Sequence, residues 1–456
     1  MAIVSGPVNG GSHGWAFGES PLGVDTFGYR QEEFFIEGDA VSYRLSSGTE
    51  LTFDGHWDAE PAGSDAFKTR LIVLRPDDPS RFNGTVLLTW NNVSGGFDAW
   101  GGGAAEGAFA EGFAYVGVTA QRVGVHGFGD DPQGLVAWDP ERYGTLSIPS
   151  DDLSYDVFTQ TALSVGSGRT GPVDPMGGLD VRKIIASGGS QSAARLATYI
   201  NAVQPLTNAM DAFLLTVYFG FGTPLDIGDA VLIPGTPDGA RAFRREPHLI
   251  RDDLGIPLMV VNSESETPYC STVRQPDTEL SRWWEVAGSV HGSPDTLRDL
   301  FGRLGRDFGI ELPASARAFH SSTHPVTDAA LHHLQTWING GSAPPQQPPI
   351  EVRGDPPQII RDRDGIGRGG VRLPQADVPL AGTSPTAEAL DFSTIDFGPQ
   401  YAPFPAEEVR RRYGDRATYL DRFEEAARRA VKSGVLLPGA VDKLLAEAAA
   451  AFPAPD

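Results

Sequence analysis

The feature that most constrains the fold of this chain is a glycine-rich turn between a strand-like run and a helix-like run. Residues 181–186 are rich in Val and Ile, Gly188-Gly189-Ser190 follows, and residues 193–200 carry Ala, Leu and Ile at helical spacing. A strand that passes through a tight turn into a helix needs small residues there, because the two elements run close together. The stretch therefore predicts a β–α unit.

Further β-rich runs recur along the chain, and most of them end at Gly, Asn, Ser or Pro. They are found at 69–74, 85–90, 114–119, 181–186, 212–216, 257–262 and 284–287. Two earlier runs, 32–36 and 40–45, suggest an initial antiparallel pair. Strand runs that alternate with helical or Gly/Pro-rich segments predict an α/β fold, with a mostly parallel sheet of about eight strands flanked by helices.

Three long connections interrupt this pattern. They cover residues 120–180, 217–254 and 292–324. Long loops in a compact enzyme usually carry function, often as a lid. We therefore expect a catalytic domain at 1–345 with these three segments as cap-like insertions.

The C-terminal quarter has its own pattern. A helix is expected from Pro325, with Gly340-Gly341 as its stop, and a Pro-rich stretch follows it. Residues 405–451 read as two helices, the first highly charged and the second starting near Gly439. We expect an extension at 346–456 whose two helices pack on the catalytic domain.

Charge and composition narrow the classes of partner. The chain has 36 Lys and Arg against 59 Asp and Glu, a net charge of −23, which repels nucleic acid and anionic membranes. No run approaches the roughly 20 apolar residues of a membrane span, and the first residues do not resemble a signal peptide. The single cysteine, Cys270, excludes an intrachain disulfide and a thiolate metal cluster. We expect a cytoplasmic protein with a small-molecule partner.

The Gly-Gly-Ser turn also has a chemical interpretation. Gly188-Gly189-Ser190-Gln191-Ser192 follows the nucleophile-elbow pattern G-x-S-x-G, with serine in the last small position. The helix N-terminus would point its free N–H groups at a reacting oxygen. The alternative is a serine that only caps a helix. Ser187 and Ser192 fit the tip of the elbow poorly.

A nucleophilic serine needs a histidine as base and a carboxylate that orients it, in the chain order serine, acid, histidine. Glu264 and Glu266 directly follow a late strand, although a solvated acidic loop would look the same. His291 directly follows the last strand-like run, and His320 and His324 are its competitors.

No cofactor or metal is predicted. Gly166–Gly171 matches G-x-G-x-x-G, but Pro172 follows where a dinucleotide site requires a helix. The chain also has no H-E-x-x-H or comparable spacing of metal ligands.

Taken together, these stretches resemble a family of mostly bacterial proteins known as α/β-hydrolase domain proteins. The resemblance is carried by residues 28–44, 81–96, 112–121, 142–160, 274–291, the G-G-S-Q-S-A elbow, N-S-E-S-E-T and the G-G-S-A-P-P tail of the late helix. It implies an α/β-hydrolase fold with Ser190 as nucleophile, Glu264 or Glu266 as acid and His291 as base. The family usually has a bulkier or charged residue where this chain has Gly189.

The expected reaction is cleavage of a carboxylic ester or lactone through an acyl-enzyme on Ser190. Glu266 is preferred as acid, because in a G-x-x-D-like turn Ser263 takes the glycine place and Glu266 the aspartate place. The backbone N–H of Gln191 and that of Asn92 or Val93 are the expected oxyanion donors. The alternatives are an acyltransferase and a non-catalytic binding protein on the same scaffold.

The segment after residue 216 is the candidate substrate pocket. It concentrates Tyr218, Phe219 and Phe221, with Leu225, Ile227, Val231, Leu232 and Ile233, at the usual cap position. An apolar wall of this kind predicts a moderately bulky apolar substrate, whereas Arg241, Arg244 and Arg245 could meet a substrate carboxylate. The alternative is that the aromatic residues simply pack in the core.

Overall fold

The computed structural model describes residues 2–19, 23–47, 51–99, 105–130, 132–226, 247–311, 319–389 and 397–453. It divides into two compact units, which we call unit 1 (Met1–Leu258 with Arg306–Gly309) and unit 2 (Met259–Gly305 with Ile310–Asp456). The two units do not meet at the boundary predicted between residues 345 and 346. That boundary stays a prediction. No helix among the described residues is long and apolar enough to span a membrane.

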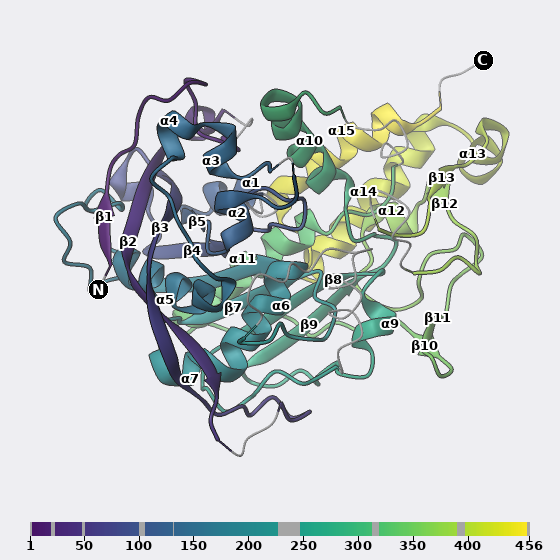
Figure 1. The fold of residues 1–456 in the computed structure, drawn as a ribbon. Helices are drawn as coiled ribbons and strands as arrows, with labels where there is room; N and C mark the ends of the chain where they lie inside the picture. The colour runs from purple at the N-terminus through teal and green to yellow at the C-terminus, as the bar shows by residue number, and fades with distance from the viewer. Residues whose placement is uncertain are drawn as a thin grey trace. The chain divides into compact units, whose positions relative to one another are not determined.

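Unit 1 is built on seven strands of the sheet (Figure 1). Their spatial order is β1 (Ile3–Ser5), β2 (Tyr29–Leu45), β3 (Ala59–Pro76), β5 (Ala114–Val118), β4 (Thr85–Trp90), β6 (Lys183–Gly189) and β7 (Ala212–Thr216). The pairs from β1 to β5 are antiparallel, and those among β5, β4, β6 and β7 are parallel. All residues of β4 and β5 are buried, as expected for parallel strands covered on both faces.

Two later strands, β8 (Leu258–Ser263) and β9 (Ser281–Val286), bring the number of sheet strands to nine. The predicted α/β class, with a mostly parallel sheet flanked by helices, is confirmed, and the strand number is one above the expected eight or so. The predicted runs 85–90 and 212–216 match β4 and β7 at both ends.

The predicted initial hairpin is wrong. Residues 32–36 and 40–45 lie in one continuous strand, β2, which pairs with β3 along its whole length. Gly38 and Asp39 look like a turn in the sequence, but they pair with Phe67 and Ala66. Cross-strand pairing therefore overrides the local turn signal.

The helices of unit 1 follow the sheet strands and fill the first predicted insertion. They are α1 (Ala105–Ala110), α2 (Arg122–His126), α3 (Leu135–Trp138), α4 (Pro140–Tyr143), α5 (Ser154–Val165), α6 (Gln191–Thr198) and α7 (Gln204–Thr207). α5 packs against β2 and β4 and buries most of its residues. This part of segment 120–180 therefore covers the sheet.

Unit 2 contains most of the remaining helices. They are α9 (Thr267–Cys270), α10 (Pro294–Phe308, whose last residues belong to unit 1), α11 (His324–Ile338), α12 (Pro374–Asp377), α13 (Ala406–Tyr413), α14 (Arg416–Lys432) and α15 (Val441–Ala451). Two short strand pairs join β10 (Val352–Arg353) to β11 (Gln358–Ile359) and β12 (Ala381–Gly382) to β13 (Ala402–Pro403). The helix expected from Pro325 is confirmed as α11.

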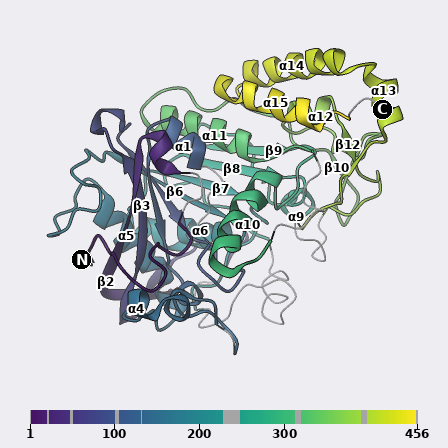
Figure 2. The same cartoon turned by 90° about the horizontal axis from the view of Figure 1, so that it is seen from above.

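The predicted pair of C-terminal helices is wrong in number, because the first of them is two helices. α13 ends at Gly414, which has a φ of 78°, and Asp415 then caps α14 by accepting the N–H of Thr418 at 2.8 Å. Glycine adopts this backbone conformation easily, and aspartate is a favoured N-cap. α14 and α15 lie side by side (Figures 1 and 2).

Candidate active site

Ser190 lies at the sharp turn between β6 and α6. Its backbone has φ 58° and ψ −118°, which is unusual for a residue other than glycine. The turn is held by a hydrogen bond from the Ser190 N–H to the Thr216 carbonyl (3.0 Å) and one from the Ala194 N–H to the Ser190 carbonyl (3.1 Å). Strained backbone of this kind is typical of functional positions, and here it has the strand–turn–helix form of a nucleophile elbow.

The two glycines before Ser190 have different close neighbours. A Cβ at Gly188 would lie 3.0 Å from the Ser192 backbone and from Leu196, so this glycine lets α6 pass close to β6. A Cβ at Gly189 would lie 2.8 Å from Thr216 Oγ1 on β7. Gly189 therefore fits closely against the neighbouring strand β7.

A buried polar network holds the first turn of α6. Gln191 Nε2 donates to Gln121 Oε1 (2.9 Å), and Gln121 Nε2 donates to Asp151 Oδ2 (3.1 Å). Arg195 Nη2, on the same helix, also reaches Asp151 Oδ2 at 2.8 Å. These supporting residues are not among those predicted from the sequence, although an arginine in a helix of small and apolar residues is a usable signal.

The loop with Asn92 and Val93, two of the expected oxyanion donors, contacts the turn at Ser190. Asn92 Nδ2 donates to the Gly189 carbonyl at 3.3 Å. The backbone N–H of Asn92 is already bonded to the Ala99 carbonyl (2.7 Å), whereas within the described residues the N–H of Val93 has no acceptor. As the first residue of α6, Gln191 has no intrahelical acceptor for its own N–H. Gln191 and Val93 are therefore the better candidates for donors.

In unit 2, Glu266 and His291 form a close pair. Glu266 Oε1 lies 2.6 Å from His291 Nδ1, and Glu266 Oε2 accepts the N–H and the hydroxyl of Ser263 at 2.8 and 2.7 Å. Glu266 is fully buried. The contact favours the His291 tautomer that has its proton on Nδ1, directed at the carboxylate, and this tautomer leaves Nε2 able to accept a proton. This is the arrangement of an acid that orients a general base.

Glu264 is engaged elsewhere. Its Oε2 accepts the N–H groups of Gly288 (2.5 Å) and Gly367 (2.9 Å), and its Oε1 forms an ion pair with Arg361 Nη1. Glu264 is fully buried, and the Arg361 side chain is nearly so. Glu264 therefore ties the turn before His291 to residues 361–367, and the geometry favours Glu266 as the orienting acid.

Further contacts within unit 2 position His291. Its N–H donates to Ser265 Oγ (3.1 Å), and the ring of Phe397 lies edge-on at 5.7 Å. Val290 belongs to a buried apolar cluster with Ala287, Ile350, Ile366, Ala376, Ala381 and Tyr401. His291 and its neighbour Val290 are therefore held partly by contacts with residues between 350 and 401.

The competing histidines have other neighbours. His320 stacks on Tyr401, with ring centroids 4.8 Å apart, and its Nδ1 lies 3.0 Å from the Ser321 carbonyl. His324 Nε2 lies 2.9 Å from Thr296 Oγ1. Among the three histidines considered as base, His291 is therefore the one joined to either candidate acid by the contacts of the described residues.

The described pocket candidates are buried. Tyr218, Phe219, Phe221 and Leu225 are at most 7% exposed, and the rings of Phe219 and Phe221 stack at 6.1 Å. This burial is compatible with a pocket wall and with core packing. Ile227, Val231, Leu232, Ile233, Arg241, Arg244 and Arg245 lie outside the described residues.

The structure thus groups the expected site residues into two sets. Ser190, Gln191, Asn92 and Val93 belong to unit 1, and Glu266 and His291 belong to unit 2. Within the described parts of the chain, no group of three or more His, Cys, Asp or Glu side chains is suited to hold a metal ion.

Comparison with known proteins identifies one extensive match. The sequence model of a family described as "Alpha/beta hydrolase domain" matches residues 4–446. The solved esterase Est22 is 13% identical with a TM-score of 0.33, over 71% of this chain and 83% of the other. The glucuronoyl esterase from Solibacter usitatus is 10% identical with a TM-score of 0.30, over 62% and 80%. No curated protein matches the chain. At these low identities and TM-scores, neither structure assigns a function to this chain.

Proposed function

The chain belongs to the alpha/beta hydrolase domain family, and from this premise we propose that it is a serine hydrolase that cleaves a carboxylic ester or lactone. The observation that carries the proposal is the backbone of Ser190, with φ 58° at the end of β6 and the start of α6. The Glu266–His291 pair at 2.6 Å supports it, because it supplies an oriented base.

In the proposed reaction, Ser190 Oγ attacks the carbonyl carbon while His291 Nε2 takes the hydroxyl proton. The backbone N–H groups of Gln191 and Val93 stabilise the negative charge on the carbonyl oxygen. The C–O bond to the alcohol then breaks, and the alcohol oxygen receives the proton from His291. A water molecule, deprotonated by His291, next attacks the acyl-enzyme, so that the carboxylic acid and free Ser190 are released.

We further propose a moderately bulky, apolar substrate. Tyr218, Phe219 and Phe221 follow β7, whose Thr216 carbonyl accepts the N–H of Ser190, so they come directly after a residue in contact with the elbow. Each methylene buried against such a wall contributes roughly 0.8 kcal/mol. With p-nitrophenyl esters from acetate to octanoate, kcat/KM should rise with chain length up to the limit of the pocket. A steady fall from acetate onward would reject an apolar acyl pocket.

Active-site labelling tests the nucleophile. A fluorophosphonate probe should label the intact protein and the Ser192→Ala variant, and should fail to label Ser190→Ala. Ser192 is a matched control because it lies in the first turn of the same helix and is fully buried. Equal labelling of Ser190→Ala would reject the proposed nucleophile.

A competing alcohol separates hydrolysis from acyl transfer. The measurement is the ratio of free acid to new ester among the products.

A further inference from the structure

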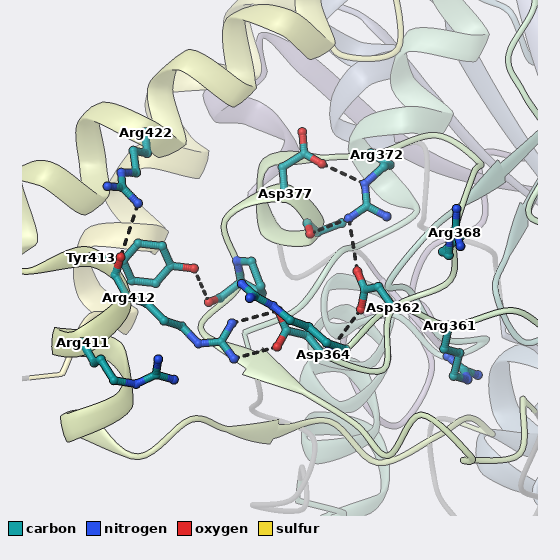
Figure 3. A pocket seen from close by; sticks show the side chains of 13 residues that line it. Arg361, Asp362, Asp364, Arg368, Arg372, Asp377, Arg411, Arg412, Tyr413 and Arg422 are labelled. Carbon is teal, nitrogen blue, oxygen red and sulfur yellow. Dashed lines mark hydrogen bonds and ion pairs between the residues drawn. The ribbon is translucent and has the colours of Figure 1, made fainter.

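Unit 2 contains an open cavity of about 740 Å³ whose lining is strongly basic (Figure 3). Its walls come from residues 361–379 and from α13 and the start of α14. Seven of its lining residues are arginines and three are aspartates, and no lysine is among them. None of the residues proposed for catalysis lines it.

The charge of this cavity contrasts with that of the chain. The protein carries a net charge of −23, whereas the cavity is lined by seven arginines and three aspartates. Glu264, Glu351 and Glu408, which do not line the cavity, pair with some of these arginines, and one positive charge is left in surplus. Cations gathered in one hollow repel one another, and this repulsion is relieved when an anion binds. A basic cavity in so acidic a protein therefore indicates an anionic ligand.

The aspartates of the cavity are used to hold two of the arginines in place. Asp364 receives Arg412 Nη1 and Nη2 at 2.8 and 2.6 Å, and Arg412 also lies over the Phe404 ring at 4.1 Å. The hydrogen-bonded guanidinium lowers the pKa of Asp364. Arg372 Nε donates to Asp377 at 2.8 Å. Arg412 Nε also donates to Glu408 Oε1 at 2.9 Å, and these ion pairs hold Arg412 and Arg372 in place.

Other arginines of the lining are only loosely paired. Arg368 and Arg411 are 58% and 74% exposed, and each comes no closer than 3.7 Å to a carboxylate, beyond hydrogen-bonding distance. Arg422 donates to the Arg412 carbonyl at 3.3 Å and lies over the Tyr413 ring at 5.9 Å. Figure 3 shows Arg411 and Arg422 on one side of Asp364 and Arg368 on the other. The guanidinium groups of these three arginines therefore lie around the paired Arg412 and Arg372.

The exclusive use of arginine indicates which anion fits. The guanidinium group is planar and binds phosphate with two parallel hydrogen bonds, which lysine cannot do. Arg411 and Arg422 on one side of the cavity and Arg368 on the other suit a ligand with more than one phosphate. The cavity volume is in the usual range for small-molecule sites, about 300–1,000 Å³. We propose that this cavity binds a small molecule carrying a diphosphate or triphosphate group.

Calorimetric titration of the full chain with inorganic pyrophosphate and triphosphate at low ionic strength tests the proposal. One ligand should bind per chain, and rising salt should weaken binding. The double variant Arg411→Gln/Arg422→Gln should weaken it at least about tenfold, which corresponds to 1.4 kcal/mol or more. Both side chains are exposed, so the variant should keep the unfolding transition of the parent protein.

Arg428→Gln is the matched control. Arg428 is on the same helix as Arg422, is 73% exposed and pairs with Glu424 outside the cavity, so its replacement should leave the affinity unchanged. Ser190→Ala should also bind pyrophosphate normally, which separates this proposal from the proposed hydrolase activity. Absent binding, an equal loss in Arg428→Gln, or citrate binding as tightly as pyrophosphate would each overturn the oligophosphate site.

Discussion

The proposed nucleophile of unit 1 and the proposed acid–base pair of unit 2 are positioned by different kinds of contact. The conformation of Ser190 belongs to one strand–turn–helix stretch, in which Gly188 allows α6 to pack closely against β6. The position of His291 depends on two buried carboxylates, and one of them binds residues 97 and 103 positions away in the sequence. The conformation of Ser190 thus follows from a local motif, whereas the position of His291 requires contacts with residues that are distant in the sequence.

The two regions also differ in how they accommodate charge. At the elbow, the buried pair Arg195–Asp151 lies beside neutral glutamines. In unit 2, Glu264 and Glu266 are fully buried two positions apart, and each has its own partners, Arg361 and His291. Buried charges need such partners because desolvation is costly. Variants of the two regions should therefore fail in different ways.

The largest expected effect is at the nucleophile. Ser190→Ala should lower kcat/KM about 10⁴-fold or more, because the acyl-enzyme can no longer form. The thermal unfolding midpoint should stay close to that of the parent protein, since the removed hydroxyl is a small group. Steady-state kinetics and calorimetry check both statements, with Ser192→Ala as the control. A large loss of stability without loss of activity would contradict the assignment.

Glu266→Gln should come next. The amide keeps the shape of the side chain but can hold His291 in the wrong tautomer, so kcat should fall by about 10³- to 10⁴-fold. KM should change little, since the pair is not expected to bind substrate. If Glu264→Gln instead gives the larger loss of kcat in fully folded protein, Glu264 is the orienting acid.

Glu264→Gln should mainly destabilise the fold. It leaves the buried Arg361 without its carboxylate, which typically costs about 3–5 kcal/mol of unfolding free energy. The double variant Glu264→Gln/Arg361→Met removes the uncompensated charge and should recover part of that loss. Urea unfolding curves measure the difference. Additive losses in the double variant would show that the two side chains do not interact.

The two glycines of the elbow offer a finer comparison. Gly188→Ala should cost about 1–3 kcal/mol of stability and much of the activity, because its Cβ would meet the Ser192 backbone, which cannot easily move. Gly189→Ala should cost less, because its close neighbour is the Thr216 hydroxyl, a side-chain atom. The reverse order would indicate that the turn depends on β7 more than on α6.

The smallest effect concerns Cys270, at the end of the short helix after the acid loop. Burial raises the pKa of its thiol well above the ordinary value, so the native protein should react with maleimide far more slowly than the unfolded protein. The Cys270 N–H donates to the Glu266 carbonyl at 2.9 Å. The rate of labelling therefore reports how often the segment that carries Glu264 and Glu266 opens. Glu264→Gln should accelerate labelling more than Ser190→Ala does.

Much of the fold could be predicted from local sequence. Runs 85–90 and 212–216 match their strands because buried parallel strands are continuous apolar stretches with clear ends. The elbow is equally local, since a strand, two glycines and a helix suffice to describe it. The errors lie where distant pairing overrides a local signal, as at Gly38-Asp39, or where one glycine, Gly414, divides a helical pattern.

By itself, the sequence determined the α/β class, and it predicted the place of the nucleophile and a short set of acids, bases and donors. The tertiary structure gives different contacts to members of that set that are chemically alike. Glu264 and Glu266 are the same residue type two positions apart, and only the contacts of Glu264 with Arg361 and Gly367 distinguish them. Likewise, the bond from Asn92 to Ala99 separates Asn92 from Val93. Composition and spacing cannot predict these hydrogen-bond partners, because the partners are distant in the sequence and come together only in the folded structure.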